Sequence, residues 1–245
     1  MIKSKENSKE NKYIQSARLC LKNAERLMYE AQWMETLAPP ASRYYLSVIA
    51  QEECAKGFLL YLVSDKIIPW NSFVLRASRD HKCKQLLCLV IDFLAPDIDE
   101  FIRRTNMVVL EKKPPEFPSR IQDALAILRH EKIGRWESNA WVWAEDPKYD
   151  EAALEVCEGK RDFEKQQSLY VEISKDGHAT ATPWQITEEQ VNKECECADR
   201  FISFLGFLKT GEPPNALDYE IVENTIRMLF DSVEYPILEK RSQNG

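Results

Sequence analysis

The chain has 245 residues, of which 44% are hydrophobic, 30% are charged and only 7 are glycine. This balance is typical of a folded helical protein, and it excludes collagen-like, low-complexity and disulfide-scaffold proteins. The net charge of -7 argues against broad, sequence-independent wrapping of nucleic acid, which needs many cationic contacts, but it leaves room for a local basic site.

The apolar runs are short, such as residues 57–63 and 86–90, and none approaches the ~18 residues needed to span a bilayer. The first dozen residues carry charge but no apolar segment, so we expect a disordered tail and not a signal peptide. The seven cysteines are odd in number and do not form the Cys/His pairs of a zinc site. We therefore expect a cytoplasmic protein with free thiols and with no membrane contact, metal or cofactor.

Helical patterns fill the first half of the chain. Residues 11–37 repeat apolar side chains at helical spacing and stop before Pro39 and Pro40. A second helix, capped by Ser42, is predicted to end near Ser64, and its apolar residues lie on almost every side, which predicts a central, buried helix. Further helices are predicted over residues 79–94, 97–110 and 119–132, the first of them amphipathic with His81, Lys84, Gln85, Cys88 and Asp92 on its polar face.

The second half of the chain adds a short hairpin to these helices. After a helical pattern over residues 150–167, residues 168–174 alternate with a period of two, and Asp176-Gly177 offers a tight turn. A capping box begins the next helix at Thr187, and a last helix is predicted over residues 216–233. These elements predict an all-α bundle with a β-hairpin near residues 168–182, organised as a tail (1–12), one domain (13–210) and a C-terminal helix (211–245) packed on it.

Glu52, Glu53 and Lys56 fall in the middle of the helix that is predicted to be most buried. Buried ionised groups are costly unless they are paired, so these side chains need partners. Glu52 and Lys56 are four residues apart in the favourable order, and a structural ion pair between them is the simplest interpretation. A functional site is the alternative, because active sites also gather such groups.

His81 lies beside Lys82 and Lys84 in a basic stretch that begins at Arg76. A titratable imidazole among cations suits a phosphate site, whereas the simpler alternative is a solvated polar face. Arg76 stands five residues before His81, which meets the Arg-x(4–6)-His spacing of a family of metal-independent ribonucleases, but it falls in a predicted loop and such spacing is common by chance.

Three motifs in this order resemble a known family. The run ASRYYLSVIAQEECAKGFLL of residues 41–60 resembles the signature helix of the HEPN superfamily, and its Glu-Glu-x-x-Lys form is similar to the AbiV family of abortive-infection proteins. His81-x-x-Lys84 fits the same family, and so does KQQSLYVE of residues 165–172, where a basic helix end runs into a Leu-Tyr-Val strand. The resemblance covers about residues 15–210.

The resemblance implies a HEPN-like helical bundle that forms a homodimer and acts in bacterial defence against phage, in a superfamily many of whose members cut RNA without a metal. His81 would then be the general acid or base that moves a proton at the ribose or the leaving oxygen. The catalytic residues implied are His81, Glu53, Lys56 and Lys84. The residues implied to bind substrate are Glu52, Lys82, Arg76, Arg161, Lys165 and Tyr170.

One departure from the ribonuclease pattern keeps other hypotheses open. Ribonuclease members carry their Arg-x(4–6)-His motif on a late helix, where this chain has Arg161 and Lys165 but no such motif. A metal-independent endoribonuclease with RNA as substrate and a phage protein as trigger is therefore weighed against two alternatives: a non-catalytic module that binds a nucleotide, RNA or phage protein, and a helical scaffold. No DNA partner is expected. For Trp136, Trp141 and Trp143, a role in the core or in an interface is preferred over base stacking.

Overall fold

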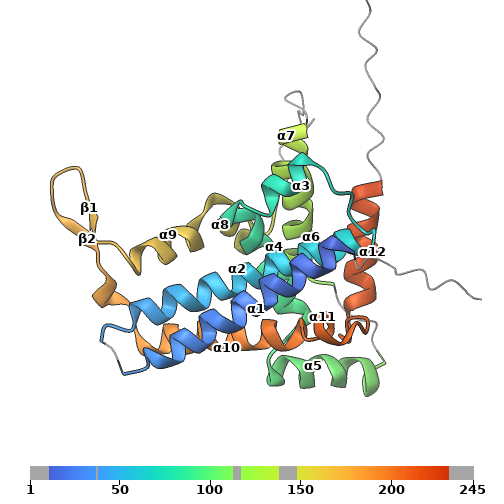
Figure 1. Ribbon diagram of the computed structural model, residues 1–245, viewed down its shortest axis with the longest axis horizontal. Helices are drawn as coiled ribbons and strands as arrows, with labels where there is room; N and C mark the ends of the chain where they lie inside the picture. The colour runs from blue at the N-terminus through green and yellow to red at the C-terminus, as the bar shows by residue number, and fades with distance from the viewer. Residues whose placement is uncertain (1–10, 37, 113–116, 138–147, 232–245) are drawn as a thin grey trace, which may run out of the picture.

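A pair of long helices forms the centre of the fold in the computed structural model, which describes residues 11–36, 38–112, 117–137 and 148–231. Helix α1 (Lys12–Trp33) and helix α2 (Ala41–Ser64) lie side by side, and α10 (Glu188–Phe204) runs along the same pair (Figure 1). Helix α4 (His81–Leu94) packs against α2 as well. Because α2 contacts all three neighbours, it is the central helix that the sequence predicts.

The burial of α2 follows from its apolar residues, which face every direction. Phe58, Leu59 and Leu62 are fully buried, and the polar residues Gln51 and Glu52 are buried among them. The start of this helix differs from the prediction. Helix α2 begins at Ala41 without a side-chain cap, so the prediction that Ser42 caps it is wrong. Pro40 precedes the helix and its rigid ring already fixes the entry of the chain.

Helix α4 is more buried than an amphipathic surface helix. Asp80 is its N-cap, and the Asp80 side chain accepts a hydrogen bond from the backbone N–H of Cys83. Lys84, Gln85 and Cys88 are buried, so the middle of the polar face predicted for this helix faces the protein interior, while His81 at its start stays half exposed. A short helix that the sequence pattern missed, α3 (Ser72–Ala77), precedes it, and Arg76 therefore lies on a helix and not in a loop.

The remaining elements surround this centre, and the predicted hairpin is present as an antiparallel pair of short strands. The capping box at Thr187 and Gln190 is confirmed at the start of α10. The predicted helix over residues 119–132 is divided, because its second half is a π-helical segment. The elements that surround the central helices are α5 (Ile98–Val109), α6 (Ser119–Ala126), η1 (Ile127–Gly134), α7 (Arg135–Glu137), α8 (Glu151–Glu158), α9 (Lys160–Gln167), β1 (Glu172–Ile173), β2 (Ala179–Ala181), η2 (Pro183–Gln185), α11 (Phe207–Thr210) and α12 (Tyr219–Asp231). The prediction of an all-α bundle with a small hairpin is thus confirmed.

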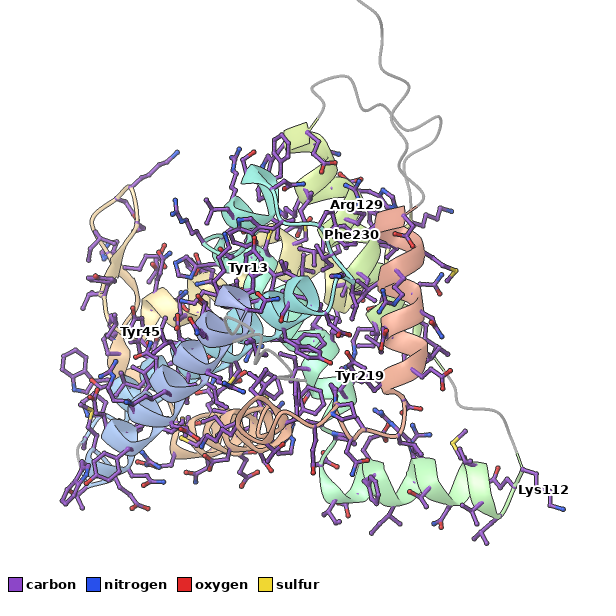
Figure 2. The ribbon with its side chains drawn as sticks, turned by 45° about the vertical axis from the view of Figure 1, so that its right-hand side comes forward. Tyr13, Tyr45, Lys112, Arg129, Tyr219 and Phe230 are labelled. Atoms are coloured by element: carbon purple, nitrogen blue, oxygen red, sulfur yellow. The ribbon has the colours of Figure 1, made fainter. Side chains whose placement is uncertain are left out.

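Helix α12 packs on the same core as the other helices. Val222 and Ile226 are buried in the main apolar cluster, and the Arg129 guanidinium lies 5.1 Å from the ring centroid of Phe230 (Figure 2). Arg129 also donates to the backbone oxygen of Leu229, which ties η1 to α12. The C-terminal helix therefore shares one hydrophobic core with the rest of the described chain.

The cysteines behave as small apolar side chains. All seven are free, and Cys20, Cys54, Cys83 and Cys88 are buried. Burial raises the pKa of the Cys20 thiol to about 11, so it stays protonated and unreactive at neutral pH. Among the described residues, none of the helices is both long enough and apolar enough to cross a bilayer.

A glycine divides the helix that was predicted over residues 150–167 into α8 and α9. Gly159 has φ of +99°, a left-handed conformation that other residues rarely adopt. A Cβ atom at this position would lie 2.7 Å from Cε of Lys82, whose ammonium donates to the backbone oxygen of Glu158. The turn at Gly159 therefore changes the direction of the chain, and α9 packs against α2 and α4 as a separate helix.

We expect Gly159→Ala to destabilise the fold by about 1 to 3 kcal/mol, since the substitution adds backbone strain at positive φ and displaces the Lys82 side chain from the backbone oxygen of Glu158. Gly177→Ala is the matched control, because Gly177 also has positive φ but has no neighbouring atom within 4 Å of a new Cβ. Urea unfolding of both variants checks this. Equal losses would contradict a specific packing role for Gly159.

Candidate functional site

The buried carboxylate of Glu52 is the centre of the candidate site. Its side chain is only 1% exposed and both oxygens are used. Oε1 accepts from Nζ of Lys165 at 2.8 Å and from Nε2 of Gln85 at 3.1 Å. Oε2 lies 2.6 Å from Nδ1 of His81 and 2.8 Å from Nζ of Lys84. Four side chains thus satisfy one buried carboxylate, which meets the requirement that a buried charge be paired and hydrogen-bonded.

Three helices bring these residues together. Positions 81, 84 and 85 are separated by three and four residues, so the side chains share one face of α4, and this face lies against α2. Helix α9 adds Lys165, which also contacts Asp162 at 2.6 Å one turn earlier. The site is therefore formed by segments that are far apart in the sequence, and the glycine turn before α9 is part of what assembles it.

The protonation states of the site follow from this pairing. Burial raises the pKa of Glu52, but the charges and hydrogen bonds of Lys84 and Lys165 outweigh it and lower the pKa to about 2. Burial lowers the pKa of Lys165, while its bonds to Asp162 and Glu52 raise it above the ordinary value, and the upward effect is the larger. Both groups are therefore ionised at neutral pH.

We expect the contribution of Glu52 to the free energy of unfolding to depend on pH. Because its folded pKa is below the unfolded value, its ion pairs stabilise the protein fully above about pH 4.5 and lose that effect as the pH falls toward 2. The stability difference between wild type and Glu52→Gln, measured by urea unfolding, should narrow by at least half between pH 5 and pH 3. A constant difference would contradict an ionised Glu52.

The imidazole of His81 has one inward and one outward nitrogen. An ionised carboxylate 2.6 Å from Nδ1 requires a proton on Nδ1, since an unprotonated nitrogen would set two acceptors against each other. Nζ of Lys165 lies 3.0 Å from the same nitrogen, but it has Glu52 and Asp162 as acceptors. The side chain is 48% exposed, and within the described part of the chain Nε2 has no hydrogen-bond partner. Glu52 thus orients the ring and directs Nε2 away from the buried network.

The donor atoms of Glu52, His81 and Asp162 lie within 4.8 Å of one another, a separation that a metal ion could bridge. The ammonium of Lys165 already contacts both carboxylates, at 2.8 Å from Glu52 and 2.6 Å from Asp162. A divalent cation would have to displace this buried charge and would be repelled by Lys84 as well. The chemistry of this group favours an ammonium-bridged carboxylate pair over a metal centre.

A second polar cluster lies next to the first and involves Arg161. Its guanidinium donates to the side-chain oxygen of Gln51 and contacts Glu194 of α10 at 2.7 Å. The amide of Gln51 also donates to Glu194 at 2.8 Å. Burial alone would lower the pKa of Arg161, but Glu194 outweighs it and raises the pKa further above its usual value. Arg161 therefore fastens α9 to α2 and α10.

Several residues implied by the family resemblance lie apart from the Glu52 cluster. Lys56 pairs with Glu53 and not with Glu52, so the ion pair expected between Glu52 and Lys56 is wrong. Arg76 stacks its guanidinium 4.2 Å from the ring centroid of Trp136, and Tyr170 is exposed beyond the end of α9. Lys82 reaches the end of α8, as described above. Trp141 and Trp143 fall outside the described residues, so their predicted roles stay predictions.

Sequence reasoning missed three residues of this region. Gln85 was placed on the polar face of its helix, and its role as a donor to Glu52 becomes clear only once α4 is docked on α2. Asp162 shares Lys165 with Glu52, and its spacing of three from Lys165 was the available signal. Arg79 is exposed, stands two residues before His81 and has no ion pair in the part of the chain that the structure describes.

The fold and the site together define an all-α bundle in which a buried Glu-Lys network orients a half-exposed histidine. The family model HEPN_AbiV, described as AbiV, matches residues 12–203. This match covers most of the chain, and the protein belongs to the AbiV family of the HEPN superfamily. No curated protein and no solved structure matches the chain.

Proposed function

We propose that this protein is a bacterial anti-phage abortive-infection protein that acts as a metal-independent endoribonuclease and so arrests translation or growth. The observation that carries the proposal is the contact between Glu52 and Nδ1 of His81, which leaves Nε2 exposed as a base. Membership of the AbiV family supports the defence role. RNA as substrate, a phage protein as trigger and a homodimeric, cytoplasmic protein are parts of the same proposal.

The proposed reaction is an internal transesterification of RNA. Nε2 of His81 takes the proton of a ribose 2′-hydroxyl, the 2′-oxygen attacks the adjacent phosphorus, and the bond from phosphorus to the 5′-oxygen breaks. The products are a 2′,3′-cyclic phosphate and a 5′-hydroxyl, with water supplying the proton to the leaving oxygen. Glu52 holds the ring and stabilises the imidazolium that forms, as a carboxylate beside a catalytic histidine does.

The buried lysines are positioning residues in this scheme. Lys84 and Lys165 have side chains only 10% and 4% exposed, and their ammonium groups contact Glu52. They hold the carboxylate in its ionised form and do not reach a phosphate in solvent. Arg79 is exposed and stands two residues before His81, and we assign the phosphate contact to it, whereas Arg76 is stacked on Trp136.

A second candidate function follows from the missing late motif. If no second general acid is present, the same polar constellation would bind an RNA, a nucleotide or a phage protein without cutting it. The full engagement of Lys84, Lys165 and Arg161 with carboxylates favours this alternative, because none of these three is left to stabilise a developing negative charge.

A growth assay separates these functions in cells. Expression of the wild type with and without phage infection is compared with His81→Ala and with His178→Ala, a control histidine that is 84% exposed on the hairpin. We expect growth arrest with wild type and His178→Ala and its loss with His81→Ala. Arrest that persists in His81→Ala would overturn the catalytic proposal and favour the binding module.

A further inference from the structure

Helix α9 brings two charged residues to the Glu52 cluster, Asp162 and Lys165. Asp162 lies in the first turn of the helix, where the helix dipole favours a carboxylate. Its Oδ1 lies 2.6 Å from Nζ of Lys165, and its Oδ2 accepts a hydrogen bond from the Gln166 amide at 3.1 Å. Both oxygens of Asp162 thus have a partner, while 20% of the side chain stays exposed.

The nitrogen Nδ1 of His81 has two neighbours that favour opposite tautomers of the ring. Oε2 of Glu52, at 2.6 Å, can only accept a hydrogen bond, so it favours a proton on Nδ1. Nζ of Lys165, at 3.0 Å, can only donate, so it favours a lone pair on Nδ1 and a proton on Nε2. Only the first tautomer leaves a lone pair on Nε2, so the balance between these neighbours decides whether His81 can act as a base.

Asp162 competes with His81 for the Lys165 ammonium. The distance from Nζ to Oδ1 of Asp162 is 2.6 Å, against 3.0 Å to Nδ1, and a carboxylate is a stronger acceptor than a neutral imidazole nitrogen. Burial lowers the pKa of Lys165, whereas Asp162 and then Glu52 raise it above its ordinary value. With both carboxylates in place, the ammonium has two anionic partners and does not need Nδ1 as an acceptor.

The charge balance of the cluster favours the same tautomer. The negative charges of Glu52 and Asp162 balance the positive charges of Lys84 and Lys165. Without Asp162, one excess positive charge would remain beside His81. A positive surrounding favours a lone pair on Nδ1 over an N–H bond, whose hydrogen is itself partly positive, so the loss of Asp162 would favour the tautomer with the proton on Nε2.

We propose that Asp162 is a positioning residue, which keeps the proton of His81 on Nδ1 by binding the Lys165 ammonium. The inference rests on the proposed function for its effect on RNA cleavage, whereas its effect on the imidazole does not depend on any substrate. Asp162 acts through Lys165 and does not itself contact the RNA.

Nitrogen NMR of the histidine side chains tests the tautomer without RNA. The chain has three histidines, so the His81 signals are assigned by their absence from His81→Ala. At about pH 9, above the ordinary pKa of histidine, the wild type should carry its proton on Nδ1. Asp162→Asn should raise the population protonated on Nε2 severalfold. Asp162→Glu keeps the charge, and Glu164→Gln changes another partly buried acid of α9, so both should keep the wild-type tautomer.

RNA cleavage by the same variants separates positioning from a merely structural role. Asp162→Asn should lower kcat severalfold with little change in KM, because fewer molecules carry the lone pair on Nε2, and circular dichroism should show it folded. A wild type protonated on Nε2, an unchanged tautomer in Asp162→Asn, or an equal change in Asp162→Glu would overturn the inference. The expected tautomer change in a protein that cuts no RNA would support the inference and contradict the nuclease proposal instead.

Discussion

Replacement of Glu52 by leucine is expected to destabilise the fold by about 3 to 5 kcal/mol, because it leaves two buried ammonium groups without their shared counter-ion. Lys84 and Lys165 both lie 2.8 Å from this carboxylate, and the side chain between them is inaccessible to solvent. Urea unfolding followed by circular dichroism measures the loss. The effect should be among the largest of any single polar substitution in the chain.

The control for Glu52 is its neighbour Glu53. Glu53 pairs with Lys56 in a more exposed position, so Glu53→Leu should cost less than about 1 kcal/mol. Adding Lys84→Met and Lys165→Met to Glu52→Leu should recover part of the loss, since the charges then disappear together. If Glu52→Leu and Glu53→Leu cost the same, the buried network does not stabilise the fold as argued.

Loss of the imidazole is expected to have the largest effect on activity. His81→Ala should lower the rate of RNA cleavage by about 100- to 10,000-fold, the usual contribution of a general base. The same variant should unfold at nearly the wild-type urea concentration, because the side chain is half exposed and Glu52 keeps three other partners. The cleavage rate on a fixed RNA checks the first expectation and urea unfolding the second.

Two further variants serve as controls for the effect of His81→Ala on RNA cleavage. Arg79→Ala should weaken RNA binding and raise KM with a smaller effect on kcat, since it would remove a phosphate contact and not the base. His178→Ala should leave both constants unchanged. A His81→Ala protein that is unfolded, or one that cleaves RNA normally, would contradict the role assigned to His81.

The sequence predicted the helices well where the pattern was strong and local. The apolar residues on every side of residues 41–64 identified the central helix, and the capping box at Thr187 identified the start of α10. The errors arose where a tertiary contact or a single backbone angle decides the structure. Gly159 ends α8 inside a helical pattern that runs over residues 150–167, and α3 is too short to show a period.

The sequence pointed to four residues of the Glu52 cluster but not to their pairings, nor to Gln85 and Asp162. Glu52, His81, Lys84 and Lys165 were all selected from the sequence, but the expected partner of Glu52 was the residue four positions later on the same helix. The actual partners come from α4 and α9, up to 113 positions away. Local spacing cannot reveal such contacts, because they depend on how the helices pack and on the turn at Gly159.

Incubation of the purified protein with a structured RNA in EDTA, beside His81→Ala, tests the central claim most directly. We expect the wild type alone to produce fragments that carry 2′,3′-cyclic phosphate and 5′-hydroxyl ends. Fragments with other end groups, cleavage that EDTA abolishes, or equal cleavage by His81→Ala would contradict a metal-independent nuclease in which Glu52 orients His81.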